Sequence, residues 1–206
     1  MASGSRECSS PYSYSCSHSH SHSHLNTVFP STASGIFELG QKLGVDAVED
    51  ISLLVLLWRL GCSGNPPGSV SLAEWTAGCS KLRVDSWQAL QGQLPAADTG
   101  FLDQTEFRDF FKFCFQFNLS GTHRTLDKEL VVALLPMVLK DRVAKDRLTT
   151  FLEFLESCTE YGRITLDQWT SFLDFCLEVP DLKDYDESTS AWPVLLDEYV
   201  EYMESK

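Results

Sequence analysis

The chain has 206 residues, of which 43% are hydrophobic, enough for one large domain or two small domains with a buried core. Its formal net charge is −13, which argues against binding nucleic acid or an anionic membrane through bulk electrostatics. No apolar run approaches the length of a membrane span, and residues 1–10 lack an apolar segment of secretory length. We therefore expect a partner with a positively charged surface.

The cysteine content favours a reducing compartment. The number of cysteines is odd, no two form a CxxC pair, and several fall within apolar helical patterns. Free thiols in the cytosol or nucleus are therefore favoured over disulfides or zinc ligation. The seven cysteines are Cys8, Cys16, Cys62, Cys79, Cys114, Cys158 and Cys176.

Residues 1–34 differ in composition from the rest of the chain. They are rich in serine, alternate Ser and His from residue 17 to residue 24, and contain almost no aliphatic residue before Leu25. Such a segment buries too little surface to offset its ordering entropy, and we predict that it is disordered. The four alternating histidines could bind a transition metal, but a solvated tail is favoured and no metal site is assigned.

From Gly35 onward the hydrophobic pattern is helical. Residues 48–60 are apolar on nearly every face, which is typical of a buried helix. Residues 104–117 contain six phenylalanines, which predicts a central helix surrounded by others. A cofactor site built on these aromatic rings is less favoured, because nothing beside them supplies phosphate or metal chemistry.

Three further helices follow in the C-terminal half. They are predicted over residues 126–139, 142–156 and about 191–203. Pro136 should kink the first of them or end it early. Ser190 is a candidate N-cap for the last helix, with Pro193 in its first turn.

Residues 70–75 and 164–169 share the same order of residue classes. Each starts with a β-branched residue, followed by Ser71 or Thr165 and, three places later, by Glu or Gln, which is the pattern of a capping box. A glycine precedes the β-branched residue by two places in both segments. These are the offsets of an EF-hand loop, in which glycine turns the chain at position six and an acid closes the loop at position twelve.

Neither loop has the ligands that calcium requires. Calcium binds several carboxylate oxygens, and the second loop offers none at positions one, three, five and twelve. The frames therefore predict helix–loop–helix pairs without the ion. Positions one, three and five hold Ser63, Asn65 and Pro67 in the first loop and Ser157, Thr159 and Tyr161 in the second, which ends on Gln168.

Catalytic constellations are also missing from the sequence. His123 is the only histidine outside the tail, so no zinc site or Cys-His pair is available in the folded part. No GxGxxG, GxSxG or phosphate-loop sequence occurs. We therefore expect no catalytic residues, cofactor or metal.

The letters YDE at residues 185–187 and AWPVLLDEYVE at residues 191–201 resemble the signature of the DCN-like (defective in cullin neddylation) family. The run FFKFCFQF at residues 110–117 is similar to that family's central helix, and so are the two degenerate EF-hand frames. The resemblance extends over residues 35–206, the whole potentiating-neddylation domain. It implies a protein that holds a cullin's C-terminal winged-helix domain together with the N-terminally acetylated tail of a neddylation conjugating enzyme.

The family's cullin-binding patch, an Asp-Ala-Asp constellation, corresponds to Asp167, Ala191 and Asp197. Ala191 and Asp197 are six residues apart, close to two helical turns, so both can face one side of a helix. Two carboxylates around a small residue let a flat basic partner approach closely. The alternative is that both are ordinary acids on helix surfaces.

The resemblance also implies a pocket for the acetylated terminus, lined by apolar side chains. Acetylation removes the terminal charge, so burial of that terminus in an apolar slot becomes feasible. Without the resemblance, the same residues would be assigned to the core. They are Leu53, Leu56, Leu57, Leu60, Val70, Phe117, Leu134 and Met137.

The sequence therefore predicts an all-α fold of two EF-hand-like helical subdomains packed as one unit, over residues 35–206. The predicted function is that of a scaffold-type, non-catalytic component of cullin neddylation in the cytoplasm or nucleus, acting by proximity. The alternatives are an EF-hand-like calcium sensor and a generic acidic interaction module. An enzyme with an essential cysteine nucleophile is a further alternative.

Overall fold

The computed structural model describes residues 32–47, 49–186 and 191–206. Helices dominate this described part of the chain, which contains nine α-helices, three 3-10 helices and one ribbon of two short strands. The predicted all-α fold is confirmed. Most of the predicted tail, residues 1–34, lies outside the described residues, and the first helix begins at Ala33, shortly before the expected domain start.

The elements follow one another along the chain with short connections. Their bounds are α1 (Ala33–Leu43), α2 (Ser52–Arg59), α3 (Leu72–Leu82), α4 (Trp87–Gln91), η2 (Leu94–Ala96), η3 (Thr99–Phe101), α5 (Gln104–Phe117), β1 (Thr125–Asp127), α6 (Lys128–Val138), α7 (Lys145–Ser157), β2 (Arg163–Thr165), α8 (Leu166–Glu178), η4 (Leu182–Asp184) and α9 (Val194–Glu204).

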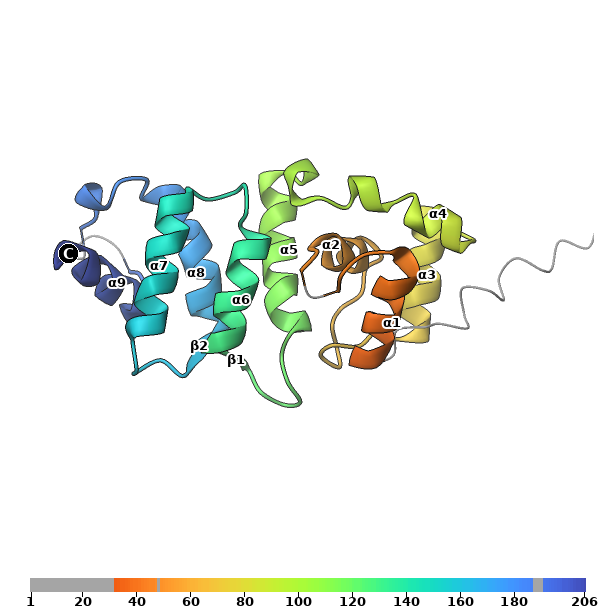
Figure 1. Cartoon of the computed structure of the whole chain (residues 1–206), viewed down its shortest axis with the longest axis horizontal. Helices are drawn as coiled ribbons and strands as arrows, with labels where there is room; N and C mark the ends of the chain where they lie inside the picture. Colours follow the sequence, from red (N-terminus) through yellow and green to blue (C-terminus); the bar gives the residue numbers. More distant parts are fainter. Residues whose placement is uncertain (1–31, 48, 187–190) are drawn as a thin grey trace, which may run out of the picture.

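Helix α5 lies in the middle of the molecule, with α1–α4 on one side and α6–α9 on the other (Figure 1). Its bounds match the predicted helix of residues 104–117. Asp103 and Glu106 form a capping box at its start, with Asp103 accepting from the Glu106 N–H at 2.8 Å. Seven of its side chains are buried, including all six phenylalanines, so α5 is the central helix that the phenylalanine pattern predicts.

Aromatic contacts join α5 to both halves of the molecule. On the N-terminal side, Trp58 packs edge-on against Phe110, with ring centroids 5.9 Å apart. On the C-terminal side, Trp169 stacks on Phe111 at 4.5 Å and donates its indole N–H to the Phe111 carbonyl at 2.9 Å. Each buried ring contributes about 1.5–3 kcal/mol through removal of apolar surface from water. The two halves therefore share one core through α5.

Both predicted capping boxes form, one on Ser71 and Glu74 at the start of α3 and one on Thr165 and Gln168 at the start of α8. The two loop glycines differ. Gly68 adopts the left-handed conformation with φ 63° and donates its N–H to the Phe117 carbonyl at 2.7 Å. Gly162 does not have a positive φ. The left-handed glycine turn expected at this position therefore forms only in the first loop.

The second loop pairs with the α5–α6 connection. Strands β1 and β2 are antiparallel, with Leu126 opposite Ile164, the residue at position eight of the second loop. Both side chains are buried. The C-terminal half is therefore a pair of helix–loop–helix units, α5–α6 and α7–α8, joined at their loops, and the first predicted frame lies in the other half.

The first loop is closed by hydrogen bonds between its own ends. The Ser63 N–H and hydroxyl both donate to Glu74 Oε1, at 2.8 and 2.6 Å, and the Ser71 N–H donates to Oε2 at 2.8 Å. Burial alone would raise the pKa of Glu74, but these hydrogen bonds outweigh it and lower the pKa to about 2. Positions one and twelve, which both bind calcium in an EF-hand, are here bonded to each other.

The last helix begins later than predicted. Helix α9 starts at Val194 with Pro193 as its N-cap residue, so Ala191 lies outside it, and Ser190, the expected N-cap, lies outside the described residues. The reason is steric, because a residue that precedes proline is disfavoured in the helical region, which excludes Trp192 from the helix. Helices α2 and α7 are also shorter than predicted at their N-terminal ends.

The predicted helix of residues 126–139 is shorter as well, because its first residues form strand β1. Pro136 lies within α6, and the helix continues past it to Val138, one residue before the predicted end, so the proline does not end the helix early. None of the described helices is long and apolar enough to cross a membrane.

Candidate functional site

The acidic patch, defined as Asp167, Ala191 and Asp197, lies on two helices of the C-terminal half. Asp167 is in the first turn of α8 and Asp197 in the first turn of α9, while Ala191 belongs to the extended segment before α9. Asp167 and Ala191 are exposed and Asp197 is half-buried. Carboxylates in the first turn of a helix are favoured by the helix dipole, so both acids are compatible with their local structure.

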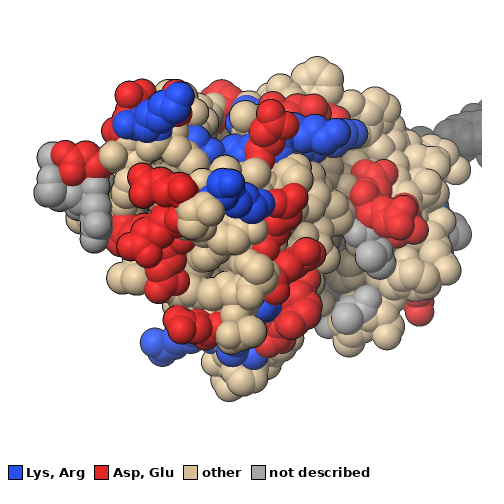
Figure 2. Space-filling view, turned by 60° about the vertical axis from the view of Figure 1, so that its left-hand side comes forward, with Lys and Arg blue, Asp and Glu red and all other residues tan. Residues whose placement is uncertain are grey.

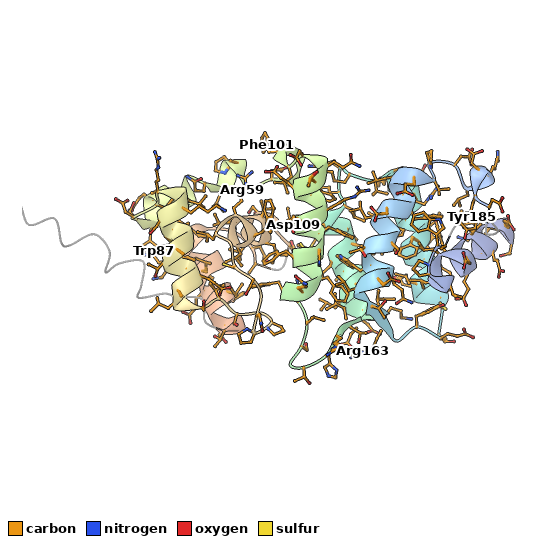
Figure 3. All side chains as sticks on the ribbon, turned by 180° about the vertical axis from the view of Figure 1, so that it is seen from behind. Arg59, Trp87, Phe101, Asp109, Arg163 and Tyr185 are labelled. Carbon is orange, nitrogen blue, oxygen red and sulfur yellow. The ribbon has the colours of Figure 1, made fainter. Side chains whose placement is uncertain are left out.

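The position of Asp167 is fixed by the β-ribbon that precedes α8. Arg163 donates from Nε to Thr125 Oγ1 and from Nη2 to the Thr125 carbonyl, both at 2.7 Å, and forms a salt bridge with Asp127 at 2.5 Å. Figure 3 shows Arg163 at the lower edge of the molecule, close to the start of α8. Thr165 is both the last residue of β2 and the N-cap of α8. The Arg163 bonds that hold the ribbon therefore also fix the position of Asp167, two residues later.

The orientation of Asp197 is set by a tyrosine. The Tyr185 hydroxyl donates a hydrogen bond to Asp197 Oδ1. The Tyr185 ring packs edge-on against Phe175 with centroids 5.7 Å apart. A carboxylate has about four lone-pair positions on two oxygens, so Asp197 retains acceptor capacity for a partner. Sequence reasoning missed this contact, although Tyr185 was part of the segment that carries the family resemblance.

Ala191 lies in a different local structure from the one expected. The prediction that Ala191 and Asp197 share one helix face is wrong, because Ala191 precedes α9. The next residue, Trp192, packs edge-on against Phe175 with centroids 5.5 Å apart, which ties the extended segment to α8. A small side chain on an anchored segment still leaves the partner room to approach.

A second tyrosine links the α7–α8 loop to the first turn of α9. The Tyr161 hydroxyl hydrogen-bonds the Glu198 carboxylate. Burial is the largest cause that raises the pKa of Tyr161, and this carboxylate raises it further. Helices α8 and α9 also pack against each other. The start of α8, with Asp167, and the first turn of α9, with Asp197, are therefore held in one part of the surface.

The C-terminal end of the molecule is acidic overall. Figure 2 brings this end forward and shows Asp and Glu spread over much of the visible face, with fewer Lys and Arg. Helix α9 supplies Asp197, Glu198, Glu201 and Glu204 to the surface around the patch. Such a face attracts a positively charged partner and repels an acidic one.

The eight residues predicted to line a peptide pocket are mostly in the core. Leu53, Leu56, Leu57, Leu60, Val70, Phe117 and Leu134 are buried, with at most 6% of their surface exposed, and Met137 is half-buried. They come from α2, the loop before α3, the end of α5, and α6. Entry of a peptide terminus between them requires these closely packed side chains to separate.

Burial favours the protonated thiol at four of the five described cysteines. Burial raises the pKa of Cys62 and of Cys176 to about 12, and it also raises the pKa of Cys79 and of Cys114. A thiol with such a pKa is protonated at neutral pH and reacts slowly. The part of the chain that the structure describes also contains no group of three or more His, Cys, Asp or Glu side chains placed to hold a metal ion.

Comparison with known proteins shows the family to which the chain belongs. The "Cullin binding" family model matches residues 89–202, more than half of the chain, and this range contains the whole acidic patch. The chain belongs to the cullin-binding, DCN1-like family, as the resemblance predicted.

Curated relatives carry the same family name. The chain is 32% identical to human DCN1-like protein 4 over 84% of its own length and 57% of the relative's, and 31% identical to human DCN1-like protein 5 over 82% and 68%. It is 29% identical to "Defective in cullin neddylation protein 1" of Caenorhabditis elegans over 82% and 62%. The chain thus spans 59% and 57% of the length of the zebrafish and human DCN1-like protein 4.

Proposed function

We propose that this chain is a non-catalytic adaptor that promotes the neddylation of cullins. The observation that carries the proposal is the match of residues 89–202 to the cullin-binding family, because this range contains the acidic patch on the surface of α8 and α9. The names of the relatives, one of which is "Defective in cullin neddylation protein 1", support the same role.

The proposed cullin contact is made by the acidic patch. Asp167 and Asp197 supply carboxylates, and Ala191 supplies a small exposed surface. The partner surface is a basic face of a cullin's C-terminal winged-helix domain. Charge-assisted hydrogen bonds to Lys or Arg give such a contact both strength and direction.

The second proposed partner is the acetylated N-terminus of a neddylation conjugating enzyme. The proposed binding region consists of the eight apolar residues of α2, the loop before α3, α5 and α6, which provide no carboxylate for a free ammonium group. An acetylated terminus is uncharged and costs much less to bury than an ammonium group. Because the described side chains are packed together, binding here includes a separation of the two halves around α5.

An adaptor of this kind raises the rate by holding donor and acceptor in register, which makes the transfer effectively intramolecular. The raised pKa values of the Cys62, Cys114 and Cys176 thiols support a role without a covalent step on the chain itself. Cytoplasm and nucleus are the compartments that we propose for it.

Calorimetry with a purified cullin winged-helix domain tests the proposal. Asp167→Lys and Asp197→Lys should each weaken binding by roughly tenfold or more, because a cation would then face a basic partner. Asp146→Lys is the control, since Asp146, like Asp167, is an exposed acid in the first turn of a helix, here α7. Absence of binding by the unmodified chain would overturn the function, and equal losses in all three variants would overturn the assignment of the patch.

A further inference from the structure

A hollow of about 670 Å³ opens on the surface of the N-terminal half, between the end of α2, the end of α3 and one face of α5. It contains no residue of the acidic patch and none of the eight predicted pocket residues. Figure 3 shows Arg59 and Asp109, two of its lining residues, in the region between α5 and the α2–α3 part of the molecule. The lining residues used below are Trp58, Arg59, Lys81, Leu82, Lys112 and Phe113.

The apolar part of the hollow is held in place. Trp58, Leu82 and Phe113 contribute it. The Trp58 indole N–H donates to Asp109 Oδ2 at 2.9 Å, and its ring packs edge-on against Phe110. The hydrogen bond and the ring contact together hold the Trp58 ring in one orientation. Little conformational entropy is therefore lost when a ligand packs against it.

The polar part of the hollow contains three cations and two carboxylates, so it is net positive although the chain carries a net charge of −13. Arg59, Lys81 and Lys112 face it from α2, α3 and α5. The salt bridges found in residues 32–47, 49–186 and 191–206 involve other cations, so none of these three is neutralised by an ion pair there.

The two carboxylates of the hollow are already hydrogen-bonded within the protein. Glu106 accepts from the Asp103 N–H at 3.0 Å in the capping box of α5, and Asp109 accepts from the Trp58 indole. Both carboxylates keep their charge, but the three cations outnumber them, and this surplus of positive charge favours an external anion. A ligand of this site should carry negative charge next to apolar surface.

We propose that the hollow binds a short acidic peptide segment of a partner protein. One aromatic or aliphatic side chain of the peptide packs among Trp58, Leu82 and Phe113, and its carboxylates pair with Arg59, Lys81 and Lys112. The volume lies in the range of sites that hold ligands of this size. A small inorganic anion would engage part of the cationic rim and leave the apolar floor uncovered, so the combination favours a peptide.

The charge distribution makes this site selective. The acidic surface of α9 repels an acidic peptide, whereas the hollow attracts it, so long-range electrostatics direct the peptide to one place. The proposed cullin contact lies on α8 and α9, which are on the other side of α5 (Figure 1). A cullin and an acidic peptide can therefore bind at the same time, and this inference does not depend on the proposed function.

A nuclear magnetic resonance titration of the full chain with the peptide Ac-Asp-Glu-Phe-Asp-Leu-Glu-NH2 tests the inference. The Trp58 indole N–H signal, assigned by its loss in Trp58→Phe, should shift in a saturable manner. The mirror-charge peptide Ac-Lys-Lys-Phe-Lys-Leu-Lys-NH2 should leave that signal unchanged. No shift of the Trp58 signal with the acidic peptide, or equal shifts with both, would overturn the proposal.

Charge-reversal variants locate the contact. Lys112→Glu, at an exposed position of α5, should weaken peptide binding by roughly tenfold, and Arg59→Glu should do the same. Lys145→Glu is the control, because Lys145 is an exposed lysine at the start of α7, outside the hollow. An equal loss in the control would show that net charge alone governs binding and would overturn the site.

Two further measurements distinguish other occupants. Inorganic phosphate at matched ionic strength should not reproduce the saturable Trp58 shift, and the same shift with phosphate would reduce the hollow to an anion site. Chain dilution should leave the Trp58 signal constant. A concentration-dependent signal would identify a second copy of the chain as the occupant and would also overturn the proposal.

Discussion

Asp197 and Tyr185 are twelve positions apart in the chain, yet one hydrogen bond makes them a unit. A surface aspartate ordinarily samples several rotamers, and each rotamer that must be frozen on binding reduces the affinity. The Tyr185 hydroxyl restricts Asp197 before any partner arrives, and the packing of its ring on Phe175 restricts Tyr185 in turn. Tyr185 is therefore a positioning residue for the proposed cullin contact.

Replacement of Tyr185 by Phe should lower the affinity for a cullin winged-helix domain several-fold, in line with the roughly 0.5–1.5 kcal/mol expected for one hydrogen bond. The ring contact with Phe175 is retained, so the melting temperature should change little. Thr150→Val removes a hydrogen bond to Tyr199, which also lies in α9 but faces α7, and serves as the control. Calorimetry and a melting curve measure both effects, and full affinity in Tyr185→Phe would show that Asp197 needs no such orientation.

Glu74 should make the stability of the first loop depend on pH. Its pKa in the folded state is about 2, below the ordinary value of 4.5, because hydrogen bonds from Ser63 and Ser71 outweigh the effect of burial. Its contribution to stability is therefore complete above pH 4.5 and is lost as the pH falls toward 2. Glu74→Gln should destabilise the chain by about 1–2 kcal/mol at neutral pH.

Urea unfolding of the two proteins at a series of pH values measures this difference. The difference in unfolding free energy should shrink as the medium becomes acidic, and a difference that is constant with pH would contradict the assignment. Ser63→Ala should reproduce part of the effect, because it removes the hydroxyl bond to Glu74 and leaves the capping box. Since these bonds already close the loop, calcium should produce no heat of binding in calorimetry.

At the scale of helices, the sequence predicted those elements whose signal is local. The bounds of α5 were correct because the dense run of phenylalanines stops at residue 117 and polar residues flank the helix at both ends. The capping boxes of α3 and α8 were correct because four consecutive residues determine them. The start of α9 was wrong, although its cause, the effect of Pro193 on the residue before it, is also local and was overlooked.

Other features depend on contacts between distant segments and could not be predicted from local patterns. The pairing of β1 with β2 joins residues 36 to 40 positions apart, and neither strand is longer than three residues. The hollow requires the relative placement of α2, α3 and α5. The patch residues came from the family resemblance and remain a prediction, whereas the Tyr185 contact with Asp197 appears only in three dimensions.

The close packing of α3 on α2 depends on Gly78. A Cβ at this position would lie 2.3 Å from the Leu60 carbonyl oxygen and 2.8 Å from Leu60 Cβ. Gly78→Ala should therefore destabilise the chain by about 1–3 kcal/mol, even though alanine favours helix over glycine. Gly162→Ala is the matched control, since a Cβ there meets nothing within 4 Å, and it should change stability by less than about 1 kcal/mol.

Thermal unfolding followed by circular dichroism measures both glycine variants. A melting temperature for Gly78→Ala equal to that of the unmodified chain would show that the two helices can move apart without cost. The variant also reports on the hollow, because α2 and α3 both line it. A shifted α3 should weaken the binding of the acidic probe peptide, and Gly162→Ala should leave that binding intact.

At the scale of the whole molecule, the arrangement of the two halves around α5 determines how the chain unfolds. Trp58 contacts α5 from one half and Trp169 from the other, through neighbouring phenylalanines on the same helix. Neither half retains its core once α5 unfolds. A small domain with one shared core unfolds in a single cooperative step.

We therefore expect the indole signals of Trp58 and Trp169 to disappear at the same temperature when unfolding is followed by nuclear magnetic resonance. Phe111→Ala should lower both transitions together, because truncation of a fully buried phenylalanine costs about 3–5 kcal/mol and this ring contacts the C-terminal half directly. Two transitions, with only the Trp169 signal responding to Phe111→Ala, would show that the halves fold separately. In that case α5 would belong to the C-terminal half, and the separation of the halves that peptide binding requires would be easier than proposed.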